Sequence, residues 1–142
     1  MEQYKLIIVP FIALIVCQII KVSIESIKNK KIMLDRLFNG AGGMPSTHAT
    51  FTISLLTLLV IECGIDSPIF AVALIFTLIV LYDAIGVRYE SGLQAKMINN
   101  IINKLESDKH LVLKEKIGHK PLEVFCGALL GFLVSIIYIL VF

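Results

Sequence analysis

The sequence predicts an all-α integral membrane protein, a helical bundle with about four transmembrane helices and a cytoplasmic amphipathic helix. Hydrophobic residues make up 57% of the 142 residues, and the mean hydropathy is +0.88. Both values exceed those of ordinary soluble domains. Charged residues form 17% of the chain, and they are absent from four stretches: 6–20, 49–61, 67–82 and 124–142. We therefore expect a single membrane domain over residues 1–142.

Each apolar stretch is extended by its flanks into one predicted helix. The first three stretches are shorter than the roughly 20 residues that cross the hydrocarbon core. Lys5 and Lys21 flank the first and can extend their stems to the headgroups. Gly127 and Gly131 in the last stretch form a G-x-x-x-G pattern, which indicates a helix-packing surface. The predicted helices run over residues 5–27, 46–63, 67–88, 92–106 and 121–142.

The helix at 92–106 is amphipathic, not membrane-spanning. Its apolar residues recur at helical spacing, with Lys96 and Lys104 off the apolar face. Two placements follow: the helix lies along the membrane surface, or it packs against the cytoplasmic ends of the bundle.

The basic residues predict the orientation. Segment 21–45 contains five Lys or Arg residues and segment 88–120 contains seven, which leaves one of the thirteen elsewhere. The short connection 62–66 contains none. By the positive-inside rule both basic loops are cytoplasmic, and both termini lie outside a multi-pass protein of the cell membrane.

Three polar motifs meet on the predicted cytoplasmic side. "MPSTH" opens the second helix, "YDAIGVR" closes the third, and "GHKPLEV" opens the last. Helix N-termini present free N–H groups and a positive dipole end, which attract phosphate. Ser46 can cap the second helix, and the planar fork of Arg88 suits two phosphate oxygens. The motifs therefore predict an anion site.

Two histidines add chemistry to this charge. His119 and Glu123 are four positions apart, so the carboxylate can fix the tautomer of the imidazole and leave its other nitrogen free to attack. His48 can protonate a leaving alcohol. Asp83, an ionisable group at membrane depth, is expected to orient a histidine or to pair with Arg88.

At these residues the sequence resembles a known family. "PSTH" is similar to the Pro-Ser-x-His motif of the type 2 phosphatidic acid phosphatase and vanadium haloperoxidase superfamily, and "GHKPLE" resembles its closing His-x-x-x-Asp element. The ordered set "GGMPSTHA", "SPIFAVAL", "YDAIGVR", "LQAKMIN" and "GHKPLEVFCGALLG" resembles the divergent bacterial and plant branch more closely, over residues 34–133.

The resemblance implies metal-free phosphomonoester hydrolysis in a helical bundle, through a phosphohistidine and without a cofactor. It implies His119 as nucleophile, Glu123 as its orienting acid and His48 as general acid. The expected phosphate ligands are Ser46, Thr47, Arg88 and Lys120, with Asp83 and Arg36 in support.

The chain departs from the family pattern at three positions. Leu113 stands six positions before the expected nucleophile, where the superfamily has arginine, and Lys114 follows it. Arg36 is followed by Leu37 where the family has Arg-Pro, and Glu123 stands in place of aspartate. Arg88 is a candidate replacement for the missing arginine.

The predicted partners are the bilayer and a phospholipid phosphate, with no nucleic acid. A cytoplasmic site favours lipids of the inner leaflet, such as phosphatidylglycerophosphate or phosphatidic acid. Two other hypotheses stay open: a non-catalytic lipid-binding or scaffolding module, and a metal-dependent hydrolase in which His48, Asp83, His119 and Glu123 ligate the ion. A homodimer would bury more apolar surface than four short helices do.

Overall fold

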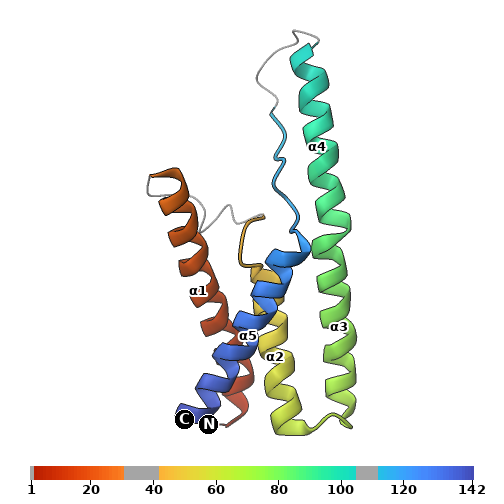
Figure 1. Ribbon diagram of the computed structural model, residues 1–142. Coiled ribbons are helices and arrows are strands. Elements are labelled where there is room, and N and C mark those ends of the chain that lie inside the picture. Colours follow the sequence, from red (N-terminus) through yellow and green to blue (C-terminus); the bar gives the residue numbers. More distant parts are fainter. Residues whose placement is uncertain (1, 31–41, 105–111) are drawn as a thin grey trace.

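The chain folds into a bundle of long helices (Figure 1). The computed structural model describes residues 2–30, 42–104 and 112–142. Within these ranges the regular structure is helical, without a strand: α1 (Glu2–Asn29), α2 (Thr47–Cys63), α3 (Pro68–Ile85), α4 (Val87–Lys104) and α5 (Pro121–Val141). Three apolar helical stretches are long enough to cross a membrane: Tyr4–Asn29, Pro68–Lys104 and Pro121–Val141. The predicted class, an all-helical membrane bundle, is confirmed.

Helix α2 lies at the centre of the bundle and contacts α1, α3 and α5. It is apolar but has only 17 residues, and its buried face is lined with small hydroxyl side chains. Thr50 Oγ1 donates to the carbonyl of Gly127 at 3.0 Å, and Ser54 Oγ lies 2.8 Å from Ser135 Oγ. Such bonds satisfy polar groups between helices where no water is available.

The G-x-x-x-G pattern of α5 forms the seam with α2, as the sequence predicts. A Cβ added at Gly127 would lie 2.3 Å from the carbonyl oxygen of Ser46, and one at Gly131 would lie 2.3 Å from that of Thr50. Only glycine allows the two backbones to approach this closely. The seam therefore fixes the position of α5 along the axis of α2.

Large apolar side chains point outward, and small ones fill the interior. Ile8, Phe76 and Phe132 are 50%, 57% and 46% exposed, which fits a hydrocarbon solvent better than water. The buried set includes Ala13, Cys17, Ala49 and Ala84. The bundle thus packs through close backbone contact more than through large core side chains.

Helix α1 continues past the expected anchor at Lys21. The structure buries Lys21 completely instead of extending it to the headgroups, so the snorkelling interpretation of this lysine is wrong. The physical reason is register: Val9, Ala13 and Cys17 recur every four residues on the face toward the bundle and are also fully buried. Lys21 is the next residue on that face.

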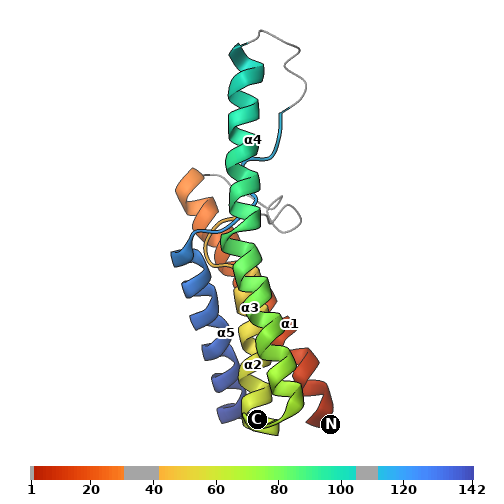
Figure 2. The same cartoon turned by 90° about the vertical axis from the view of Figure 1, so that its right-hand side faces the viewer.

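Helix α4 begins at Val87, earlier than the expected 92, and runs on from α3 along nearly the same direction (Figures 1 and 2). It projects beyond the bundle, which differs from both expected placements. Helical bonding continues across the junction: the Gly86 N–H donates to Tyr82 O at 2.8 Å, and the Glu90 N–H donates to Gly86 O at 2.9 Å. The chain therefore bends little at Gly86.

Both termini and the connection between α2 and α3 lie at one end of the bundle, opposite the starts of α2 and α5 (Figure 1). An ion pair of 2.6 Å between Lys5 and Glu62 joins the helices at that end. This relative arrangement agrees with the charge counts, whereas which end is cytoplasmic stays a prediction.

Helix α2 is shorter than the helices around it. At 1.5 Å per residue its 17 residues span about 26 Å, less than a hydrocarbon core of about 30 Å. Helix α1 and the α3–α4 rod extend beyond the start of α2 (Figure 1). The start of α2 is thus recessed at the rim.

The seam yields a stability prediction. We expect Gly131→Leu to destabilise the protein by about 1–3 kcal/mol or more, because the side chain would push α5 away from the Thr50 backbone. Leu129→Phe, at a position 48% exposed on the same helix, is the matched control. The measurement is thermal unfolding in detergent, and equal unfolding temperatures for the two variants would contradict the proposed role of the seam.

Candidate active site

His119 is positioned by backbone contacts just before α5 begins. Its N–H donates to the carbonyl of Ala84, near the end of α3, at 3.0 Å. Gly118 lies against α4, where an added Cβ would be 2.2 Å from the Tyr89 nitrogen. The start of α5 is therefore attached to the junction between α3 and α4.

The segment leading to His119 is also held further along α4. The Asn99 side chain donates to Leu113 O and to a carboxylate oxygen of Glu115, and it accepts from the Leu113 N–H, each at 2.9 Å. A Cβ at Gly92 would meet Glu115 O at 2.4 Å. The backbone of Leu113 therefore attaches this segment to α4 through two hydrogen bonds with the Asn99 side chain.

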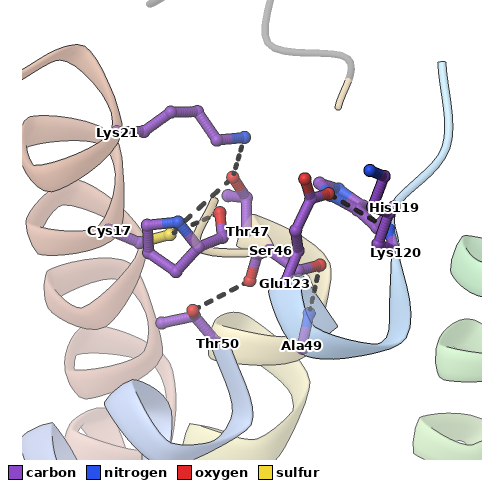
Figure 3. A network of polar contacts seen from close by, with 10 residues as sticks. Cys17, Lys21, Ser46, Thr47, Ala49, Thr50, His119, Lys120 and Glu123 are labelled. Atoms are coloured by element: carbon purple, nitrogen blue, oxygen red, sulfur yellow. Dashed lines mark hydrogen bonds and ion pairs between the residues drawn. The ribbon is translucent and has the colours of Figure 1, made fainter. Parts of the chain in front are cut away.

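The His119 side chain pairs with Glu123, as the spacing predicts. His119 Nδ1 lies 3.2 Å from Glu123 Oε2, and the same oxygen accepts the Lys120 N–H at 3.1 Å (Figure 3). Because a carboxylate only accepts, Nδ1 carries the proton, and Nε2 is the nitrogen that can attack. The Ser46 N–H donates to Glu123 O at 2.9 Å, which ties α5 to the start of α2.

Burial makes His119 less basic. The side chain is 2% exposed, and this burial lowers the pKa of His119 from its ordinary value of 6.5. Hydrogen bonds with Glu123 and with the Gly43 backbone oppose the shift, whereas the charge of Lys21 adds to it. The neutral imidazole, which is the nucleophilic form, therefore dominates near neutral pH.

The second histidine lies against a cation. His48 Nε2 is 3.2 Å from a terminal nitrogen of Arg88, and the Arg88 Nε pairs with the carboxylate of Asp83. Of the two roles expected for Asp83, pairing with arginine is the one observed. Since a guanidinium only donates, His48 Nε2 accepts, and in the neutral ring the proton lies on Nδ1.

The two imidazoles face each other across a short gap. Their ring centroids are 6.1 Å apart, with an interplanar angle of 67°. This separation is below the roughly 12 Å limit for two groups that act on one phosphate through hydrogen bonds of ordinary length. The structure thus brings His48, Arg88 and Asp83 to His119 and Glu123.

Sequence reasoning missed Lys21 as a member of this group. Its ammonium donates to Thr47 Oγ1 at 3.1 Å, one residue before His48 (Figure 3). The available signal was the four-residue spacing in α1, since Lys21 continues the series of Val9, Ala13 and Cys17. A fully buried ammonium needs polar or anionic partners, so Lys21 supplies a second cation to the site beside Arg88.

The remaining expected ligands have different surroundings. Ser46 is the N-cap of α2: its fully buried hydroxyl accepts from the Ala49 N–H at 3.5 Å (Figure 3). Thr47 is half-buried and Lys120 is exposed. Arg36 lies outside the described residues.

A polar cavity of about 650 Å³ lies next to this group. Its lining includes Gly43 and Gly118, together with four lysines and three glutamates: Lys28, Lys96, Lys116, Lys120, Glu25, Glu115 and Glu123. The lysines exceed the glutamates by one, so the lining carries a small excess of positive charge.

Within the described ranges, no group of three or more His, Cys, Asp or Glu side chains is arranged to hold a metal ion. The hypothesis that His48, Asp83, His119 and Glu123 ligate a metal also places a cation beside Arg88, which contacts His48 and Asp83. The observed charges favour an anion instead.

The fold and this site define a small polytopic membrane protein with two histidines and two cationic side chains gathered at one end of its bundle. Residues 2–134 match the model of the Divergent PAP2 family, and the chain belongs to that family. It is also 38% identical over 139 residues to a Bacillus subtilis (strain 168) protein named uncharacterized membrane protein YuiD, a match that covers 88% of this chain and 87% of that protein. No solved structure is significantly similar.

The environment of His119 predicts a specific titration. We expect its imidazole to titrate below pH 6.5, and Glu123→Gln to lower this pKa further, because the carboxylate favours the protonated ring. The measurement is NMR of labelled histidine in detergent micelles. Glu115→Gln, whose carboxylate contacts Asn99, is the control and should leave the titration unchanged. A higher pKa in Glu123→Gln would rule out the pairing.

Proposed function

We propose that the protein is a membrane phosphatase that hydrolyses a lipid phosphomonoester through a phosphohistidine intermediate. The observation that carries the proposal is the pair of imidazoles 6.1 Å apart, one bonded to the carboxylate of Glu123 and the other to the guanidinium of Arg88. Membership of the Divergent PAP2 family supports a phosphatase-related activity.

The phosphate binds between two cations at the start of α2. Lys21 approaches from α1 and contacts Thr47, whereas Arg88 approaches from the beginning of α4 and contacts His48. The first N–H groups of α2 add the positive end of its dipole. Two cations and a helix N-terminus offset a dianion in a recessed site, and they do not depend on the family arginine that Leu113 replaces.

In the first half-reaction, His119 Nε2 attacks phosphorus. A P–N bond forms and the P–O bond to the lipid alcohol breaks. His48, which is protonated once Arg88 has turned to the phosphate, gives its Nδ1 proton to the leaving oxygen and becomes neutral. Glu123 holds the Nδ1 proton and stabilises the positive charge that develops on the ring. Lys21 and Arg88 stabilise the phosphoryl oxygens in the transition state.

In the second half-reaction, water attacks the phosphohistidine. His48, now deprotonated, takes a proton from this water, the P–N bond breaks, and inorganic phosphate leaves through the polar cavity of about 650 Å³. No metal takes part in either step.

The substrate is a glycerolipid phosphate of the cytoplasmic leaflet, such as phosphatidylglycerophosphate or phosphatidic acid. The charge counts of the basic loops support an inward-facing site, and the recessed start of α2 suits a phosphate that reaches in from the headgroup region. The four lysines of the polar cavity attract anionic headgroups.

The two histidines should differ in their dependence on the leaving group. His119→Ala should abolish turnover of every substrate, since it removes the covalent route. His48→Ala should cost on the order of 10²–10⁴-fold with a lipid alkoxide, and much less with nitrophenyl phosphate, whose leaving group departs without a proton. The measurement is kcat/KM for both substrates, with Lys104→Met on the exposed end of α4 as the control.

Three outcomes have clear meanings in this experiment. Equal losses for both variants on both substrates would reject the division of roles. A fully active His119→Ala would reject the enzyme. Vanadate binding by the wild type without turnover of any phosphate would favour the non-catalytic lipid-binding alternative, because vanadate occupies the site of the transferring phosphoryl group.

The orientation has its own test. In a background with Cys63 and Cys126 replaced by Ser, Asp66→Cys should react with an impermeant maleimide in intact cells. Asn29→Cys should react only after permeabilisation, because the charge counts place it on the cytoplasmic side. Both positions are exposed, so accessibility within the protein does not decide the result. The reverse pattern would exclude the inward-facing site.

A further inference from the structure

A second cavity, of about 370 Å³, lies beside His48 between α1, α2 and α3. Thr47 and His48 line it, so it borders the proposed phosphate site. Its other walls include the apolar side chains of Leu14, Phe51 and Val80. A volume of this size is within the range of ligand sites, and apolar walls with few polar groups are typical of them.

The cavity lies next to the lipid-facing surface. Phe76, one of its lining residues, is 57% exposed, and Val72 and Ile79 on the same helix are 68% and 61% exposed. An apolar chain can therefore pass between the bilayer and the cavity without crossing water.

Two polar atoms of this lining are buried and lack a partner in the described part of the chain: Gln18 Oε1 and His48 Nδ1. Such atoms are costly unless a ligand or water satisfies them. Because His48 Nε2 faces the guanidinium of Arg88, Nδ1–H is a donor without an acceptor. The Gln18 amide can turn either its oxygen or its NH₂ group toward a ligand.

The position of Gln18 matches a particular part of a lipid. Gln18 precedes Lys21 by three residues in α1, which is about 4.5 Å along the helix axis, toward the membrane interior. If Lys21 binds the phosphate, Gln18 lies at the depth of the lipid group that is a few bonds away from the phosphate. In a glycerolipid phosphate that group is the glycerol ester, whereas in a polyprenyl phosphate it is hydrocarbon.

We propose that the cavity beside His48 binds the glycerol ester region and one acyl chain of the substrate, with Gln18 hydrogen-bonded to the ester group. This inference rests on the proposed phosphatase function, and it makes Gln18 the residue that selects glycerolipid over polyprenyl phosphates. The leaving glycerol oxygen then lies beside His48 Nδ1, the nitrogen without a partner. A buried amide left without an ester partner disfavours the all-hydrocarbon lipid.

The test measures binding to the full-length His119→Ala variant in detergent, so that it does not depend on turnover. The ligands are dioctanoyl phosphatidic acid and farnesyl phosphate. Gln18→Leu in this background should lower the affinity ratio of phosphatidic acid over farnesyl phosphate about 10-fold, since it removes one hydrogen bond from a buried site. Gln94→Leu, on the exposed side of α4, is the matched control and should keep the ratio of the parent.

A second variant keeps the inference testable if Gln18→Leu does not fold. Val80→Trp fills the cavity, and it should lower binding of both lipids at least about 10-fold relative to vanadate. An unchanged ratio in Gln18→Leu, or unchanged lipid binding in Val80→Trp, would overturn the inference. Failure of the phosphatase function has a different signature: wild-type protein that hydrolyses neither nitrophenyl phosphate nor any lipid phosphate, with the Gln18 effect on binding retained.

Discussion

The close approach of α2 and α5 determines the geometry of the whole site. Because Gly127 and Gly131 let the backbones meet at Ser46 and Thr50, the start of α5 is held at the height of the start of α2. The bond from the Ser46 N–H to Glu123 O, 2.9 Å long, closes this contact at the top. A larger residue at the seam would separate two histidines that belong to different helix ends.

Charge is the second constraint on this site. Lys21 is fully buried and donates to Thr47 Oγ1, whereas Arg88 is partly exposed and pairs with Asp83. A buried ammonium is costly unless polar or anionic groups surround it, and a bound anion would add to these partners. Uncharged polar groups inside the bundle also need hydrogen-bond partners. The hydroxyls of α2 find them in α5 and in their own helix, so few of these donors are unsatisfied in the described core.

Much of this arrangement could be predicted because it depends on local pattern. Apolar runs marked the bundle, G-x-x-x-G marked the seam, and the positions of His48, Arg88 and His119 at helix ends were enough to bring them to one rim. Lys21 could not be placed this way, since its burial depends on the register of α1 against α2, a long-range property. The direction of α4 could not be predicted from the sequence either. Amphipathic spacing shows which face is apolar, but not whether the helix turns at Gly86 or continues.

The continuity of α3 and α4 links the polar arm mechanically to the chemistry. Asp83 and Arg88 lie on either side of Gly86, and they are paired across it. Any bend of the rod at this glycine changes the distance between the two side chains, and with it the contact of Arg88 with His48. Because this ion pair spans the junction, a force on α4 that bends the rod at Gly86 acts directly on Arg88 and on its contact with His48.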